Sequence, residues 1–214
     1  DWSSDVCSSD LVATSIAERV SYAVVVTAPA GTGKSRLCHE LLRRLRRQDV
    51  APLLLLSRGD PMSSGSPYAM LRQALRGLCG VPDGAALEEG RAQLAARLGQ
   101  HLPEGARGRV VEFLAELCGL PFPAEERPLL RAARLVPDRM AEEVQQALCD
   151  LIRAECQRGG VLLVLEDLHW GDAQSARLCE GLLRELADEP LVVLAIGRPE
   201  LLERFPRLFE GRER

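Results

Sequence analysis

The sequence predicts an α/β fold in which a mainly parallel sheet lies between two layers of helices. Four short runs are continuously apolar, as strands buried on both faces are. Segments with apolar residues at helical spacing separate these runs, the alternation typical of parallel sheets. The chain has 214 residues and is 46% hydrophobic, which suits one large domain of this kind or two small ones. The predicted strands are Tyr22–Thr27, Ala51–Ser57, Val161–Leu165 and Pro190–Ile196.

The first predicted strand is followed by a helix from Lys34 to about Gln48 that places leucines on one face. Its last turns carry Arg43, Arg44, Arg46 and Arg47. We interpret this cluster as a solvated face at the negative end of the helix dipole.

The second predicted strand leads into a loop from Arg58 to Pro67 that is dense in turn-forming residues. Ser66 as N-cap and Pro67 at the first helical position then begin a helix that continues to about Leu78. The loop lies on the same rim of the sheet as the other strand ends. It could read the state of a ligand there, but a simple connection is the favoured interpretation.

Residues 81–135 are helical in pattern but interrupted by glycine and proline, and we interpret them as a helical insertion. The predicted helices are Ala85–Leu98 and Ala106–Leu117, and Pro121, Pro123 and Pro128 mark a loop.

Two longer helices complete the predicted domain. Asp138 caps the first, which ends at Gly159 and Gly160 before the third strand. Asp172 caps the second, which runs to about Ala187 before the fourth strand.

The ends of the chain are expected to be incomplete. Residues 1–11 have neither the basic start nor the apolar stretch of a signal peptide. They resemble a translated sequencing adapter, so we treat them as non-native and residues 12–214 as a partial domain. The chain ends in a charged segment, Glu210–Arg214, with no closing element.

Composition excludes several classes of protein. A net charge of −4 argues against a nucleic-acid surface spread over the whole chain. The apolar runs are too short to span a bilayer. Seven cysteines without a Cys-x-x-Cys spacing indicate reduced, semi-buried thiols and therefore a cytoplasmic location.

The clearest motif follows the first strand. Lys34 is the only lysine among 27 basic residues, and it lies in a Gly-x-Gly-Lys-Ser sequence. A strand that enters a Gly-rich turn ending in Gly-Lys-Ser is a phosphate-binding loop, the Walker A motif. Lysine suits this place because its compact ammonium reaches between the β- and γ-phosphates. The residues expected to bind nucleotide are Ala30, Gly31, Thr32, Gly33, Lys34, Ser35 and Arg36.

The loop predicts ATP and Mg²⁺ as ligands. Gly31 and Gly33 permit backbone angles that direct successive N–H groups at phosphate oxygens, and the following helix adds its positive end. Ser35 supplies a hydroxyl ligand for Mg²⁺. Alanine stands at position 28, where the motif has its first glycine; this is tolerable if Ala28 has a negative φ.

A second motif ends the third strand, where Glu166 and Asp167 follow an apolar run as in a Walker B motif. Parallel strands bring their carboxyl ends to one rim, so both acids are expected beside the phosphate loop. We assign Glu166 to Mg²⁺ and Asp167 to activation of the attacking water, and Lys34 completes the catalytic set. The usual order is Asp then Glu, so the two roles could be exchanged.

Three further residues follow these motifs, and two of them have two interpretations each. His169 could contact phosphate or relay a conformational change, but a structural hydrogen bond is favoured. Trp170 is expected to pack at the rim. Arg198, after the fourth strand, is a candidate sensor of the γ-phosphate or a solvated loop arginine.

The segment Val161–Asp172 resembles the signalling ATPases of the STAND class, and it is most similar to their origin-recognition-like AAA domain. The segments Ser57–Pro67 and Leu191–Pro206 resemble versions attached to bacterial serine/threonine kinases and cyclases. The resemblance covers residues 20 to 210. It implies a P-loop sheet of order 5-1-4-3-2 and carries over Lys34, Ser35, Glu166, Asp167 and Arg198.

The same resemblance implies that strand five, a helical lid and sensing repeats would follow Arg214. It implies partners within the same polypeptide, namely a kinase or cyclase and helical repeats, and nucleotide-dependent self-association. It does not carry over kinase activity, because no protein-kinase motif is present. We expect the isolated chain to be marginally stable and a weak ATPase.

Three functions compete on the sequence alone. The leading hypothesis is a regulatory ATPase whose ATP binding and hydrolysis switch a larger signalling protein. A small-molecule kinase would use the same loop, but residues 81–135 show no concentration of substrate-binding groups. A non-catalytic scaffold or DNA-loading protein has no support from the acidic balance of charge.

Overall fold

A four-stranded parallel sheet forms the centre of the molecule. The computed structural model describes residues 8–47, 51–62 and 65–210. In those ranges the strands lie in the order β1-β4-β3-β2, and every neighbouring pair is parallel. This confirms the predicted α/β fold and the 1-4-3-2 part of the predicted order. The strands are β1 (Tyr22–Thr27), β2 (Leu53–Arg58), β3 (Val161–Glu166) and β4 (Leu191–Gly197).

The register of the sheet brings the carboxyl ends of all four strands to one level. Thr27 pairs with Gly197, and Arg58 pairs with Glu166. The residues that follow each strand therefore leave the sheet at the same rim.

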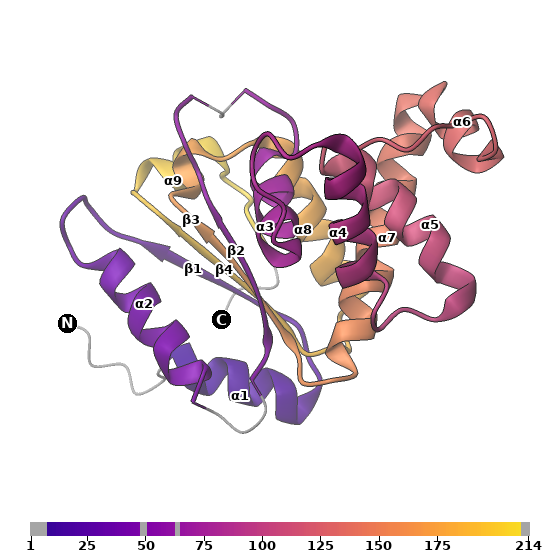
Figure 1. The fold of residues 1–214 in the computed structure, drawn as a ribbon. Helices are drawn as coiled ribbons and strands as arrows, with labels where there is room; N and C mark the ends of the chain where they lie inside the picture. Colours follow the sequence, from indigo (N-terminus) through magenta and orange to yellow (C-terminus); the bar gives the residue numbers. More distant parts are fainter. Residues whose placement is uncertain (1–7, 48–50, 63–64, 211–214) are drawn as a thin grey trace.

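Helices cover both faces of the sheet (Figure 1). α1 (Ser8–Glu18) and α2 (Lys34–Leu45) lie on one face, where Leu162 and Val164 join their core. α3 (Ala69–Cys79), α7 (Pro137–Cys156) and α8 (Ala173–Glu185) lie on the other. The alternate strand residues Leu163 and Leu165 belong to this second core, as the two-residue period of a strand requires.

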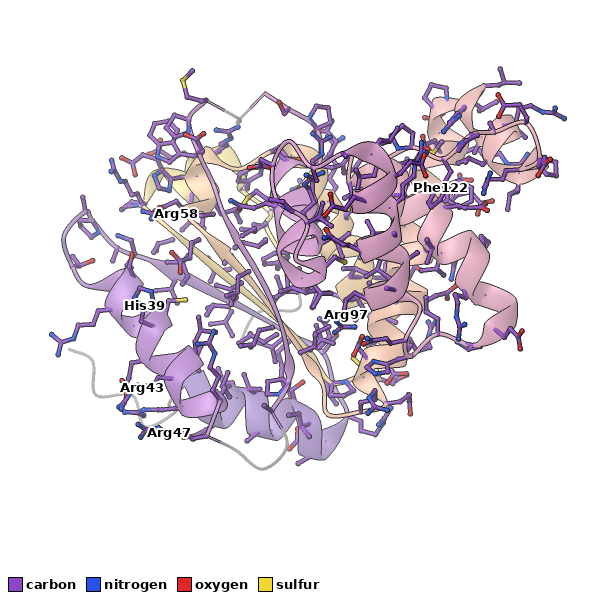
Figure 2. All side chains as sticks on the ribbon, viewed as in Figure 1. His39, Arg43, Arg47, Arg58, Arg97 and Phe122 are labelled. Atoms are coloured by element: carbon purple, nitrogen blue, oxygen red, sulfur yellow. The ribbon has the colours of Figure 1, made fainter. Side chains whose placement is uncertain are left out.

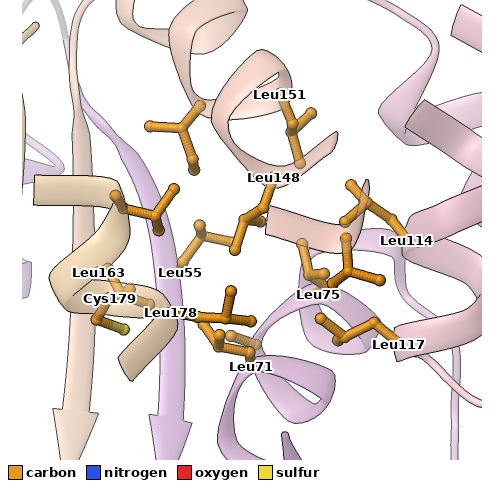
Figure 3. Packing of buried hydrophobic residues seen from close by; sticks show 14 of the residues in the cluster. Leu55, Leu71, Leu75, Leu114, Leu117, Leu148, Leu151, Leu163, Leu178 and Cys179 are labelled. Carbon is orange, nitrogen blue, oxygen red and sulfur yellow. The ribbon is translucent and has the colours of Figure 1, made fainter. Parts of the chain in front are cut away.

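Residues 81–135 contribute to the core on the second face of the sheet. They contain α4 (Leu87–Leu98), α5 (Glu104–Leu117) and α6 (Pro128–Arg134). Figure 3 shows how leucines of α5 and α7 meet those of α3, α8 and the strands in one apolar cluster. Its labelled members are Leu55, Leu71, Leu75, Leu114, Leu117, Leu148, Leu151, Leu163, Leu178 and Cys179.

Two predicted helix starts and one predicted loop were wrong. α3 begins at Ala69, after Tyr68, and not at Pro67. Pro128 begins a helix instead of marking a loop, because proline at the first helical position needs no N–H partner. Asp138 lies in the first turn of α7, whose N-cap is Val136.

Three elements besides α6 were not predicted. α1 begins at Ser8, inside the segment that we treated as non-native, and buries Val12. A 3-10 turn, η1 (Leu168–Trp170), follows β3, and α9 (Glu200–Arg204) follows β4. Gln48, the predicted end of α2, lies outside the described residues; the helix itself ends at Leu45.

The cysteines agree with the expectation of reduced thiols. The six in the described ranges are free, five of them buried and Cys79 half-buried. Within the same ranges, no helix has both the length and the apolar character needed to cross a bilayer.

Candidate functional site

The loop between β1 and α2 has the backbone of a phosphate-binding loop. Gly31 has φ 79° and Gly33 has φ 91°, both in the left-handed region that glycine tolerates. Among the described non-glycine residues, positive φ occurs at Arg19, Tyr68, Asp167 and Phe209. Ala28 therefore has a negative φ, which meets the condition for alanine at this position.

Lys34 folds back over this loop. Its Nζ donates to the carbonyl oxygens of Ala28 and Pro29, each at 2.6 Å. The Thr32 hydroxyl donates to Pro29 O at 2.9 Å. The ammonium thus lies within the curve of the loop, where a phosphate oxygen can take the place of a carbonyl.

A cavity of about 750 Å³ opens at the rim, in front of this loop. Four of its side chains are cationic, namely Lys34, Arg36, Arg58 and Arg198, and two are acidic, Asp60 and Asp167. A surplus of positive charge in a concave site suits a polyphosphate. The other lining residues are Ala30, Gly31, Gly33, Ser35, Gly59, Pro61, Gln73 and Trp170.

The two predicted acids have different surroundings. Glu166 does not line the cavity; it accepts a hydrogen bond from the thiol of Cys38, one turn after Ser35 in α2. Burial, together with this bond, raises the pKa of Cys38 to about 12, so the thiol remains a donor. Asp167 lines the cavity itself. Glu166 is the last residue of β3, whereas Asp167 follows the strand with a left-handed backbone, and only Asp167 lines the cavity.

Asp167 is held in an unusual backbone conformation, with φ 49°. The start of the β2–α3 loop packs directly against it: a Cβ on Gly59 would lie 2.3 Å from Asp167 O. The Gly59 N–H also donates to Glu166 O at 2.7 Å. The position of this carboxylate therefore depends on a neighbouring strand.

Arg58 is the residue of β2 that reaches the acid. Its Nε donates to Asp167 Oδ2 at 2.8 Å, and the backbone N–H of Arg58 donates to Gln73 Oε1 at 2.6 Å. The hydrogen bond with Asp167 raises the pKa of Arg58 above its usual value. Figure 2 shows Arg58 near the rim, whereas Arg43 and Arg47 lie toward the far end of α2. Arg43 and Arg44 pair with Glu40 on that exposed face.

His169 connects the two inner strands. Its Nδ1 lies 3.4 Å from the backbone N–H of Arg198, and Arg204 donates to its carbonyl oxygen at 3.0 Å. Burial lowers the pKa of His169, so the imidazole is neutral at pH 7. These contacts favour the structural interpretation of His169, while the Arg198 side chain lies at the cavity.

The buried carboxylate of Asp172 links the start of α3 to α8. It accepts from the N–H groups of Tyr68, Met70 and Ser175 and from the Ser175 hydroxyl, at 2.8 to 3.2 Å. It caps α8, as predicted, and it also holds the start of α3. This long-range anchor replaces the cap expected from Ser66.

The donor set at the rim fits Mg²⁺. This ion takes few protein oxygens and completes its octahedron with water and phosphate. Ser35 and Glu166, on α2 and beside α2, could supply those oxygens. In the described ranges, no group of three or more His, Cys, Asp or Glu side chains could hold a metal alone. The phosphates would therefore have to contribute ligands.

Sequence reasoning missed Arg58 and Gln73 as residues of the cavity. Arg58 stands at the last position of β2, on the rim that the phosphate loop shares. This position at the end of a strand was the sequence signal that could have identified Arg58. The contact of Gln73 with Arg58 comes from a helix and could be recognised only in three dimensions.

Comparison with known families agrees with this geometry. Residues 11–194 match the model of the AAA ATPase domain. The chain belongs to this AAA ATPase domain family. Membership accounts for the parallel sheet in the order β1-β4-β3-β2, with the phosphate loop after β1 and paired acids at the end of β3.

The AAA ATPase domain has a curated relative in Rhizobium meliloti (strain 1021), an uncharacterized protein. The two are 29% identical over 184 residues, which cover 82% of this chain and 16% of the relative. The chain therefore spans about a sixth of the length of that protein.

Proposed function

We propose that this AAA ATPase domain binds and hydrolyses Mg²⁺·ATP and acts as a nucleotide-dependent switch in a larger signalling protein. One observation carries the proposal. A single cavity is lined by the phosphate loop with Lys34, by the acid Asp167 and by the arginines 36, 58 and 198. A carboxylate that faces bound triphosphate can orient water, whereas a phosphate-binding scaffold needs none.

The two acids have separate proposed roles. Glu166 interacts with Cys38, one turn after Ser35 in α2, and we assign it to Mg²⁺ together with Ser35. Asp167 faces the cavity, where water attacks the γ-phosphate. Mg²⁺, when bound, neutralises charge on the phosphate oxygens. This geometry supports the original assignment of the pair over the exchanged one.

The proposed setting is a longer cytoplasmic polypeptide. The R. meliloti relative is about six times as long as the matched region, which leaves room for input and output domains. We propose that this longer polypeptide carries a kinase or cyclase as output and helical sensing repeats, and that it undergoes nucleotide-dependent self-association. This proposal rests on the resemblance of the segments Ser57–Pro67 and Leu191–Pro206 to domains attached to bacterial kinases and cyclases.

The test measures Mg²⁺·ATP binding and phosphate release for Asp167→Asn and Glu166→Gln. We expect Asp167→Asn to retain ATP binding and to lose turnover by roughly 100-fold, the contribution of one positioned base. Glu166→Gln should weaken the Mg²⁺ dependence of binding. Asp188→Asn, an exposed site away from the cavity, is the matched control. Unchanged turnover in Asp167→Asn would contradict the role of Asp167.

A further inference from the structure

Arg58 is the residue at the rim whose presence the Walker motifs do not explain. It ends β2, two strands away from β4 and one away from the strand that carries the acids. Its guanidinium nevertheless faces the same cavity as the phosphate loop. The side chain is 66% exposed, so it can change partners without breaking packing.

We propose that Arg58 is a ligand of the terminal phosphate of bound ATP and thereby distinguishes ATP from ADP. The proposal rests on the ATPase function above. It adds to that function a residue at the end of β2 that binds the third phosphate.

The position of Asp167 places Arg58 at the γ-phosphate end of the site. The loop amides and the start of α2 surround the phosphates nearer the ribose. The attacking water lies between its activating carboxylate and the γ-phosphorus. Because Arg58 Nε is 2.8 Å from Asp167 Oδ2, the guanidinium adjoins that same point.

Hydrogen bonds hold the backbone at Arg58 and Gly59 in place. The N–H of Arg58 is bonded to Gln73, and the next N–H, from Gly59, is bonded to Glu166 O. Only the side chain itself has freedom to move. The bond to Asp167 uses one of the five N–H donors of the guanidinium, a planar fork that matches phosphate oxygens.

A phosphate competes well with Asp167 for this arginine. The carboxylate carries one charge, whereas the terminal phosphate carries more and offers three oxygens. Asp60 is the other acid of the cavity wall. ADP lacks the terminal group, so Arg58 would remain on Asp167 when ADP is bound.

The experiment measures ATP and ADP affinities, each with Mg²⁺, by calorimetry on the 214-residue chain. We expect Arg58→Ala to weaken ATP binding roughly tenfold or more, as for loss of one charge-assisted hydrogen bond. The same variant should weaken ADP binding less than about twofold. The ATP affinity of Arg58→Lys should lie between those of the wild type and Arg58→Ala. Arg207→Ala, an exposed arginine paired only loosely with Glu210 at 4.0 Å, is the matched control and should change neither.

A second arm separates phosphate binding from mere positioning of Asp167. Arg58→Ala is repeated in the Asp167→Asn background, with folding checked by circular dichroism. If Arg58 binds the phosphate, its replacement by alanine still weakens ATP binding more than ADP binding in this background. Equal losses for ATP and ADP, or an effect that disappears in this background, would overturn the inference. A wild-type chain that binds no ATP would instead refute the proposed function.

Discussion

At the residue scale, Lys34 has a place that suits an ammonium and not a guanidinium. Its Nζ reaches two carbonyl oxygens of the loop, both at 2.6 Å. The chain uses arginine at all 26 other basic positions, obtained by subtracting this lysine from 27. A compact charge inside a narrow loop explains why the exception occurs here.

The first prediction concerns this residue. Lys34→Arg keeps the positive charge but enlarges the head group, so it should weaken Mg²⁺·ATP binding by roughly tenfold. Calorimetric titration with ATP measures the change. Arg207→Lys, at an exposed site, serves as the control. Equal ATP affinity for wild type and Lys34→Arg would show that charge alone suffices.

At the scale of elements, the rim depends on close contact between β2 and β3. Gly59 follows β2 and lies against Asp167, where even a methyl group would meet the carbonyl oxygen at 2.3 Å. Arg58, one residue earlier, bonds to the carboxylate of the same aspartate. The loop that sequence reasoning treated as a simple connection therefore shapes the site.

The second prediction tests this contact. Gly59→Ala forces the two strand ends apart, so it should destabilise the fold by about 1 to 3 kcal/mol and reduce phosphate release. Thermal unfolding and a turnover assay measure both effects. Gly65→Ala is the matched control, because a Cβ there has nothing within 4 Å. If both variants behave alike, contact between the strands does not control the site.

At the scale of the whole molecule, Asp172 joins elements that are distant in the sequence. Its carboxylate holds Tyr68 and Met70, at the start of α3, to Ser175 in α8. Both helices belong to the core that residues 81–135 share with the sheet. One buried carboxylate thus anchors the rim to the hydrophobic core.

The third prediction follows from these bonds. Asp172→Ala leaves buried N–H groups without acceptors, so it should cost about 3 kcal/mol of unfolding free energy. For a chain of this size, that lowers Tm by roughly 6 to 12 °C. Differential scanning calorimetry provides the measurement, with Asp188→Ala as an exposed control. A Tm within 2 °C of wild type would show that other contacts hold α3, by the same conversion.

The sequence by itself determined the strands, their parallel arrangement and the phosphate loop, while the order of the strands came from the family resemblance. These depend on local signals: continuous apolar runs, glycines at fixed places and one lysine. It also placed Glu166, Asp167 and Arg198 at one rim, because parallel strands end together.

Only the tertiary structure decided which side chains meet at that rim. It placed Asp167 at the cavity and Glu166 against Cys38, brought Arg58 to Asp167 over 109 positions, and gave Asp172 its partners in α3. It also packed residues 81–135 into the main core. The physical reason is that side-chain pairing depends on the packing between distant elements, which no local pattern in the chain encodes.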